Sequence, residues 1–254
     1  KDIQKGIVKK NVPVLYTPNN ESKTFTMYYI LDMGSNHNKK LPLAINYLPY
    51  LGNSSYTPEQ IQQEFYKLAC SFGVFNSEDQ CYLYLNGLTE NFEKATALFE
   101  NLLSDAKPNP DALKNLVSDI LKTRSDAKLD KNAILTAEFS YAKYGPVSPA
   151  TNILSEKELK ALQPEELISI LKSLTSYDHR ILYYGSTKLN DLIAQLNRLH
   201  KSPETLKALP AETKFEELPT PVNKVYAIDY DMAQAEIMLV SKSEMYYKML
   251  TPSI

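Results

Sequence analysis

Residues 39–68 read KKLPLAINYLPYLGNSSYTPEQIQQEFYKL and contain two helical patterns separated by a short break. The first pattern is an apolar segment at 41–48. The second begins at Thr57 and Pro58, with Gln60 three residues after the threonine. A threonine N-cap, a proline at the first helical position and a glutamine within reach of the cap form a capping box. The stretch therefore predicts two helices joined by the tight Gly-Asn-Ser-Ser break.

This arrangement resembles the pitrilysin/insulinase family of zinc peptidases, the inverzincins. In that family an H-x-x-E-H motif lies on the helix just before such a break, where two His hold zinc and the Glu acts as general base. Aligned on the Tyr-Leu-Gly-Asn break, the motif positions fall on Leu43, Asn46 and Tyr47. Leu offers a metal no lone pair, Asn cannot take a proton from water, and Tyr is not a usual zinc ligand. The resemblance thus implies a non-catalytic half that lacks the H-x-x-E-H motif.

The resemblance also points to a third zinc ligand on a helix further along the chain. Active family members carry a Glu there, and the best matching residue is Asp119 in LVSDIL. With no imidazoles opposite it, Asp119 is expected to be solvated or paired with Lys114 or Lys122. We therefore expect no catalytic residue, no metal and no other cofactor in this chain, and we treat Asp119 as a fourth degenerate motif position.

The composition is that of an ordinary globular protein. The 254 residues are 43% hydrophobic, and 28 basic against 30 acidic side chains give a formal net charge of −2. This balance leaves no excess of positive charge that would attract nucleic acid or anionic lipid, so neither is an expected partner. No apolar run approaches the ~20 residues needed to span a bilayer, and the first ten residues lack a signal-peptide core. We expect a soluble protein, either cytoplasmic or periplasmic/exported.

Strand and helix patterns follow one another along the chain. Val12–Tyr16 and Thr24–Met33 have strand character and are predicted to form a hairpin. Further strands are predicted at 80–86 and 180–185, and further helices at 91–104, 110–121, 132–142, 155–158, 164–173 and 189–200. The predicted fold is α+β in two layers: a mixed, mainly antiparallel sheet packed against several helices, as in one unit of a pitrilysin-like peptidase.

The sequence changes character after residue 201. Residues 202–222 contain four prolines and no sustained apolar stripe, which indicates a linker. Beyond it, 225–230 and 235–240 have strand patterns, and a helix is expected to begin at Met245. We therefore divide the chain into a unit at 1–201, the linker, and the first strands of a second, incomplete unit at 223–254.

Histidines and cysteines show no ligand or redox motif. His37, His179 and His200 are the only histidines, and none forms the i, i+4 pair of a zinc-binding helix. Structural roles in a loop, at a strand start and at a helix end are the default for them, with a shared zinc site as the alternative. Cys70 and Cys81 form no C-x-x-C. Both a disulfide between them and two buried free thiols are left open.

Tyrosine is enriched in the predicted strands. The 18 tyrosines include the pair Tyr28-Tyr29 and similar pairs at 183–184 and 246–247. Neighbours in a strand point to opposite faces, so each pair is expected to place one ring inside and one outside. Exposed rings could line a peptide-binding wall, because Tyr combines apolar area with a hydroxyl group. Strand propensity explains the same enrichment.

The resemblance implies two functions from different classes. In the first, the chain is part of the catalytically silent half of a zinc peptidase and encloses a peptide that a zinc-bearing half, in the same or a partner polypeptide, hydrolyses. Zinc is then expected in that other half, and this chain alone is expected to be inactive. In the second, the chain is a non-enzymatic scaffold or protein-binding module on the same fold. An H-x-x-E-H unit upstream in the same gene, or in a neighbouring one, favours the first.

Overall fold

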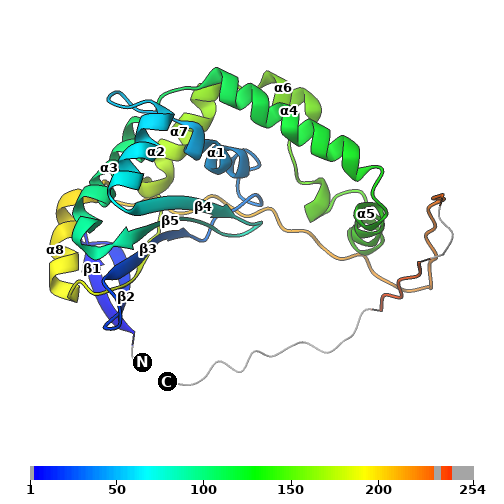
Figure 1. Ribbon diagram of the computed structural model, residues 1–254. Helices are drawn as coiled ribbons and strands as arrows, with labels where there is room; N and C mark the ends of the chain where they lie inside the picture. The colour runs from blue at the N-terminus through cyan, green and yellow to red at the C-terminus, as the bar shows by residue number, and fades with distance from the viewer. Residues whose placement is uncertain (1–2, 232–235, 242–254) are drawn as a thin grey trace. The chain divides into compact units, whose positions relative to one another are not determined.

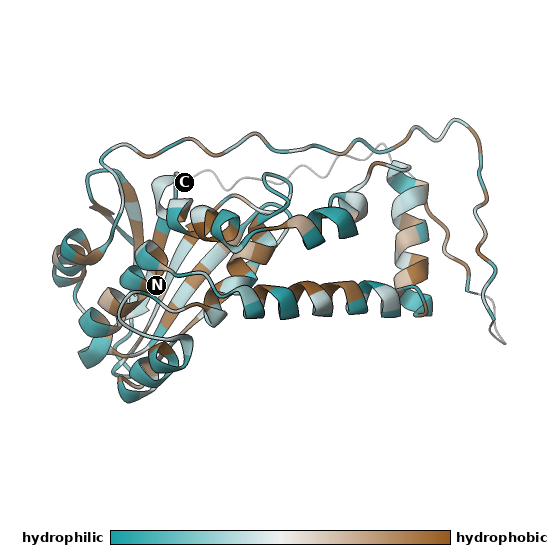
Figure 2. Ribbon diagram, turned by 90° about the horizontal axis from the view of Figure 1, so that it is seen from above, coloured by the Kyte–Doolittle hydropathy of each residue, from teal (hydrophilic) through white to brown (hydrophobic). Residues whose placement is uncertain are grey.

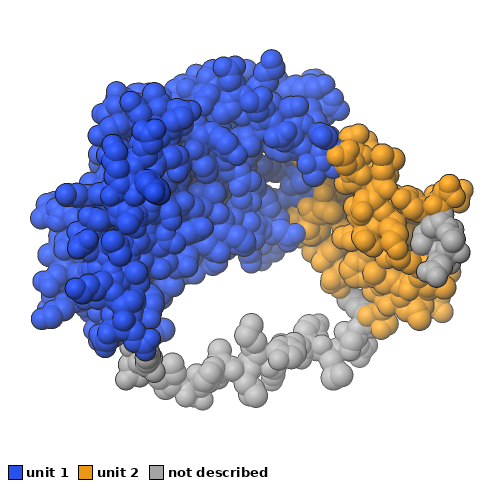
Figure 3. Space-filling view, in the orientation of Figure 1, with its two compact units in different colours: residues 1–123, 152–214 blue, residues 124–151, 215–254 orange. Residues whose placement is uncertain are grey.

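The computed structural model describes residues 3–231 and 236–241. The chain divides into two compact units (Figure 3). Unit 1 consists of residues 1–123 and 152–214, and unit 2 of residues 124–151 and 215–254. The division predicted from the sequence, with a linker at 202–222, stays a prediction.

Unit 1 is built on a six-stranded sheet with the order β1-β2-β6-β3-β5-β4. The parallel pair is β2 with β6, and the other neighbours run antiparallel. The sheet is therefore mixed and mainly antiparallel, as predicted. Its strands are Gln4–Val8 (β1), Val12–Pro18 (β2), Thr24–Leu31 (β3), Cys70–Asn76 (β4), Cys81–Leu88 (β5) and Arg180–Gly185 (β6).

Helices cover one face of this sheet (Figure 1). Helices α1 and α2 pack on β4, α3 packs on β5, and α8 packs on β1. This two-layer arrangement confirms the predicted α+β class. None of the helices in the described ranges is long and apolar enough to cross a bilayer. The helices are Leu41–Tyr47 (α1), Pro58–Lys67 (α2), Phe92–Asp105 (α3), Pro110–Ala127 (α4), Lys131–Tyr144 (α5), Glu156–Ala161 (α6), Pro164–Ser173 (α7) and Leu189–Leu199 (α8).

The core lies between the sheet and the helices. On β3, Phe25, Met27, Tyr29 and Leu31 face the helices and are each 1% exposed. The intervening side chains of the same strand are only half-buried, because they point to the other face of the sheet. Each large apolar side chain buried in this way stabilises the fold by roughly 1.5–3 kcal/mol. Helix α4 also packs one apolar side against this core, visible in Figure 2 as brown and teal alternating along its ribbon.

Local capping signals are confirmed in the helices. Thr57 and Gln60 form the capping box that starts α2, and Ser155 and Glu158 form the one that starts α6. Asn91 is the N-cap residue of α3, but its side chain does not cap the helix. It donates instead to the Leu68 carbonyl at 2.8 Å, because the end of α2 lies next to it.

The predicted hairpin of the second and third strands is wrong. Strand β6 lies between β2 and β3 and pairs with both. The connection at 19–23 therefore spans a strand instead of making a tight turn, and Asn19 N–H donates to the Gly185 carbonyl at 2.8 Å. The true partner of β2 on its other side is β1, which sequence analysis missed. Its turn uses Lys9 and Lys10 at φ 51° and 68°, a conformation usually signalled by Asn or Gly.

In unit 2, the strands expected at 225–230 and 235–240 are not formed in the described residues, which have no regular secondary structure there. A strand forms when its backbone N–H and C=O groups pair with a neighbouring strand. Residues 222–231 instead contact the rest of unit 2 through side chains. The Tyr230 hydroxyl, for example, donates to the Leu129 carbonyl at 2.7 Å. Ala235 and the helix expected from Met245 lie outside the described residues.

Candidate functional site

Helix α1 carries the three residues that the sequence alignment places at the positions of the zinc motif. Leu43 and Tyr47 are 5% and 0% exposed, because α1 packs its apolar side against β4 and α7. Asn46 lies on the exposed side, where its Oδ1 accepts a hydrogen bond from the Asn76 amide at 3.3 Å. The side chains at the two His positions of the motif therefore point into the protein.

The Tyr47 hydroxyl ties α1 to the start of α4. Its O–H donates to the Asn109 carbonyl at 2.6 Å and accepts from the Asn109 N–H at 2.7 Å. The side chain of Asn109 in turn accepts from the Ala112 N–H at 3.2 Å and so caps α4. Burial raises the pKa of Tyr47, and the hydrogen bond with Asn109 offsets part of that rise. Where the family pattern places a zinc ligand, this chain has Tyr47, whose hydroxyl makes structural hydrogen bonds.

Asp119 is exposed on the surface of α4. It lies nine residues after Pro110, about 14 Å along the helix axis from the end that Tyr47 contacts. Asp119 is therefore several turns along α4 from Asn109, the residue that Tyr47 contacts. Within residues 3–231 and 236–241, no group of three or more His, Cys, Asp or Glu side chains is arranged to hold a metal ion.

The sheet face away from the helices carries a cluster of aromatic rings, which we call the open face. It consists of Tyr28 on β3, Phe75 on β4, Tyr82 and Tyr84 on β5, and Tyr184 on β6. The rings of Phe75 and Tyr82 stack with centroids 4.6 Å apart, and Tyr28 meets Tyr82 edge-on at 5.5 Å. Phe75 and Tyr184 are 44% and 41% exposed. Large apolar surface thus remains accessible on this face.

The prediction for the adjacent tyrosines is confirmed at two of the three pairs. Tyr29 is 1% exposed while Tyr28 lies on the open face, and Tyr183 is 0% exposed while Tyr184 is 41% exposed. The pair at 246–247 lies outside the described residues.

A glycine on the edge strand allows one of these rings to lie flat. A Cβ added at Gly73 would stand 2.3 Å from ring atoms of Tyr84, so the ring covers the glycine backbone of β4. The Tyr28 ring adjoins Tyr84 on the other side, with centroids 5.8 Å apart. Covering a strand glycine with a cross-strand aromatic ring also supports the strand pairing. The rings therefore form a continuous row across β3, β5 and β4.

An ion pair lies at one end of the aromatic cluster. Arg180 binds Asp32 through two hydrogen bonds of 2.5 and 3.0 Å, and Gln80 donates to the same carboxylate at 2.9 Å. The hydrogen bond from Arg180 holds the pKa of Asp32 below its ordinary value. Along β3, β4 and β5 the side chains of this face are uncharged, including the hydrogen-bonded pair Ser71 and Asn86. The arrangement suits contact with a neutral chain segment.

Comparison with known proteins identifies the fold. No protein-family model and no curated protein matches the sequence. Among solved structures, a peptidase M16 inactive domain from Pseudomonas fluorescens matches with a TM-score of 0.69 at 20% identity, over 85% of this chain and 53% of that chain. The chain has the fold of a peptidase M16 inactive domain.

Two further M16-type structures match over most of this chain. The periplasmic protease PqqL from Escherichia coli has a TM-score of 0.70 at 13% identity, over 85% of this chain and 26% of that one. The ferredoxin protease FusC, solved in complex with Arabidopsis ferredoxin, has a TM-score of 0.68 at 15% identity, over 82% and 23%. This chain thus spans about half of the first structure and about a quarter of the other two.

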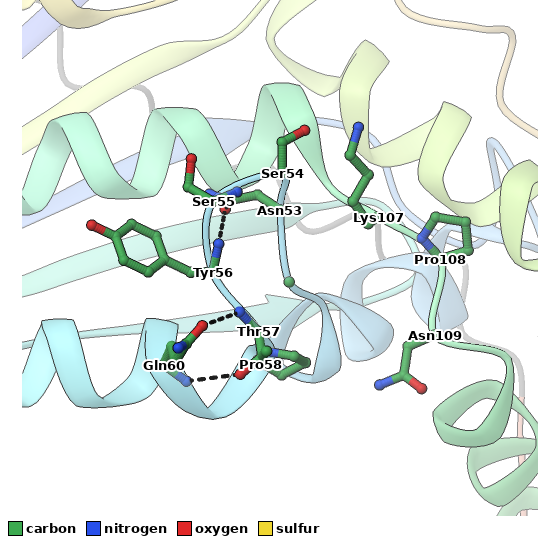
Figure 4. A pocket seen from close by; sticks show the side chains of 11 residues that line it. Asn53, Ser54, Ser55, Tyr56, Thr57, Pro58, Gln60, Lys107, Pro108 and Asn109 are labelled. Carbon is green, nitrogen blue, oxygen red and sulfur yellow. Dashed lines mark hydrogen bonds between the residues drawn. The ribbon is translucent and has the colours of Figure 1, made fainter.

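On this M16 fold, a hollow lies beside the break between α1 and α2 (Figure 4). It has a volume of about 340 Å³ and is lined by residues 52–58, 60 and 107–109. Its polar groups are engaged with one another: Asn53 Oδ1 accepts the N–H groups of Ser55 and Tyr56 at 2.9 and 2.8 Å. Lys107 is paired with Asp105 at 2.9 Å. These contacts fix the shape of the loop and occupy the polar groups of the hollow. The open face is therefore the better candidate for a binding site.

The fold also brings two distant histidines together, which sequence analysis missed. The Nε2 atoms of His179 and His200 are 2.9 Å apart, and His200 Nδ1 lies 2.7 Å from Glu100 Oε1. The available signal was Glu100 itself, a carboxylate within the apolar stripe of α3. His37 lies elsewhere, where its Nδ1 accepts from the Gly34 N–H at 3.2 Å.

The two cysteines are free and buried, so the free-thiol alternative is confirmed. They occupy opposite ends of the β4–β5 hairpin, because Cys70 pairs with Gly87 while Cys81 pairs with Asn76. Burial raises the pKa of the Cys70 thiol, and it raises that of Cys81 to about 12. Neither group is activated as a nucleophile.

Proposed function

We propose that this chain is a non-catalytic, peptide-enclosing part of a zinc-dependent metallopeptidase. Zinc and the general base are supplied by another half, in the same polypeptide or in a partner. There the metal polarises the scissile carbonyl and activates water. The observation that carries the proposal is the exposed aromatic open face on the fold of an M16 inactive domain.

The open face fits the task of holding an extended peptide. Phe75 and the tyrosines offer large, rigid surfaces that lose little side-chain entropy on binding. Tyrosine hydroxyls add donors and acceptors for the backbone of a bound segment. Because the rows on β3, β4 and β5 are uncharged, an apolar or neutral segment binds there without burying an unpaired ion.

We further propose that residues 223–254 begin a second unit of the same kind, after a linker at 202–222. Apolar side chains in this region are strongly exposed: Val225 93%, Ile237 83% and Leu239 93%. Exposed apolar stretches of this kind mark surfaces that another element covers. The 53% coverage of the Pseudomonas fluorescens structure supports the same reading, since such relatives contain more chain than this one.

A binding assay with matched variants tests the open face. The probe is a fluorescent, unstructured peptide of neutral side chains, and its affinity for the purified chain is measured by anisotropy. We expect Phe75→Ala to weaken binding by about tenfold, as for a partly buried aromatic anchor. Tyr66→Ala serves as the control, because Tyr66 is 86% exposed on α2, away from the open face. Equal loss in both variants, or no loss in either, would overturn the assignment.

A second measurement distinguishes the peptidase part from a scaffold. The chain alone should leave the peptide intact with added zinc, and an H-x-x-E-H half encoded in the same or a neighbouring gene should hydrolyse it faster when this chain is present. If no such half is encoded there, the scaffold function is favoured.

A further inference from the structure

A continuous network of hydrogen bonds runs through the core of unit 1. The carboxylate of Glu100 on α3 lies at its centre. Its Oε1 accepts from the Tyr29 hydroxyl at 2.6 Å and from His200 Nδ1 at 2.7 Å, and its Oε2 accepts from the Lys201 N–H at 3.0 Å. His179 extends the network through its contact with His200. The four side chains are between 1% and 6% exposed.

The hydrogen-bond partners fix the ring protons of both histidines. His179 Nδ1 lies 2.7 Å from the Tyr177 carbonyl, which can only accept, so this nitrogen carries a proton. In a neutral His179 the Nε2 is then an acceptor, and His200 Nε2 must donate to it. His200 Nδ1 also donates, because it faces the carboxylate of Glu100. Burial raises the pKa of Glu100, but its hydrogen bonds together hold it below the ordinary value.

The network lies where residues 201–207 dock on unit 1. At one end of this segment, the N–H of Lys201 donates to the buried carboxylate of Glu100. At the other end, the N–H of Lys207 donates to the Ser176 carbonyl at 2.8 Å, and its carbonyl accepts from the Asp178 N–H at 2.9 Å. The segment is thus fixed at both ends by residues next to or within the network.

We propose that the His179–His200–Glu100 chain is an acid-sensitive latch, which holds residues 201–207 in place and releases them when His179 takes up a second ring proton. That proton adds to Nε2, the atom that accepts from His200. Two N–H groups would then face each other across 2.9 Å, on rings whose centroids are 5.1 Å apart. The hydrogen bond between His179 and His200 is then lost, and the two N–H groups repel each other.

The surroundings of His179 offer little compensation for a charge on its ring. Glu100 faces it from α3, but this carboxylate is already paired with His200. Tyr29 contributes a neutral ring from β3. The adjacent Asp178 favours the charged form, yet burial outweighs it and lowers the pKa of His179 to about 4.

Proton uptake by His179 is coupled to the release of residues 201–207. The docked form holds His179 neutral, while in the released form the ring is hydrated and binds a proton near the ordinary pKa of 6.5. The released form therefore binds one more proton between these two pH values. The opening equilibrium is expected to rise by up to about tenfold for each unit by which the pH falls in this window.

Backbone amide exchange of the intact chain tests the latch. Exchange at Lys201 and Lys207 is measured from pH 7.5 to pH 4.5 and corrected for the pH dependence of intrinsic exchange. We expect the protection of both amides to fall below about pH 6.5, approaching tenfold per pH unit. Amides of Leu83 and Leu85 in β5 should remain more strongly protected than both at every pH, because they open only by global unfolding.

Variants separate the latch from general acid unfolding. His179→Gln keeps a donor and an acceptor but does not titrate, so we expect protection of 201–207 in this variant to be independent of pH over the window. His37→Gln, outside the network, should keep the wild-type dependence. If His179→Gln does not fold, the NMR titration of His179 in the unaltered protein replaces it, and a midpoint well below 6.5 is expected. The proposal would be refuted by pH-independent protection of 201–207 in the unaltered protein, by an unchanged slope in His179→Gln, or by a His179 midpoint near 6.5. It would also be refuted if the protection of 201–207 equalled that of β5, because the segment would then open only by global unfolding.

Discussion

Tyr47→Phe tests whether the hydroxyl of Tyr47 on α1 has a structural role. The substitution keeps the buried ring and removes only the hydroxyl that binds both the N–H and the carbonyl of Asn109, at 2.7 and 2.6 Å. A polar group left unpaired by such a change costs about 1–3 kcal/mol. Asn109 is only half-buried, so water can replace part of the loss. We expect the free energy of unfolding to fall by about 2 kcal/mol.

Urea unfolding followed by circular dichroism measures this loss through the shift of the midpoint at unchanged slope. Tyr50→Phe is the matched control, because Tyr50 lies three residues away in the same turn and is 49% exposed. Its effect should stay within about 0.5 kcal/mol, as for most surface substitutions. If Tyr47→Phe were equally neutral, the hydroxyl would not hold α4 to α1, and the structural role assigned to this position would fail.

Further predictions follow from the same contacts. The L43H/N46E/Y47H variant should lose stability without gaining zinc-dependent peptide hydrolysis, because positions 43 and 47 point into the core; stoichiometric zinc together with hydrolysis would contradict this. Gly73→Ala should destabilise the protein by about 1–3 kcal/mol in urea unfolding, since its Cβ clashes with a ring of the open face; an unchanged midpoint would show that the ring has room to move. Both thiols should resist alkylation at pH 8 until the protein is unfolded; labelling of the folded protein would contradict their burial. Burial lowers the pKa of His179, so the unfolded state binds more protons than the folded state as the pH falls from 6.5 to 4. This residue alone should therefore lower the free energy of unfolding by up to about 3 kcal/mol over that range. If the free energy of unfolding of His179→Gln fell with pH as steeply as that of the unaltered protein, this prediction would be wrong.

Local signals in the sequence predicted local structure well. The capping boxes at Thr57 and Ser155 are both present, because each depends on residues within one helical turn. Strand partners were not predictable in the same way. Val14 on β2 pairs with Ile181 on β6, and nothing in the run around either residue specifies the other. The predicted hairpin failed for this reason, although the strands themselves were found.

The candidate site shows the same division between local and long-range information. Alternation along a strand placed Tyr28 and Tyr29 on opposite faces, so the open face was partly predictable. The buried network was not, since Glu100, His179 and His200 come from three separate parts of the chain and meet only in the fold. An acidic residue within an apolar helix stripe signals that some partner exists, but it does not say which one.

The residues at the proposed motif positions show how α1 is held in place. A zinc-binding helix must present two His to an open site, and this requirement keeps polar ligands on one side of the helix. Without it, the same positions are free to stabilise the core: Leu43 is 5% exposed and Tyr47 is 0% exposed. Tyr47 also binds the start of α4, so the helix is retained by packing and hydrogen bonding. Packing and hydrogen bonding therefore account for this helix, and the proposed peptide-enclosing role depends on the open face of the sheet.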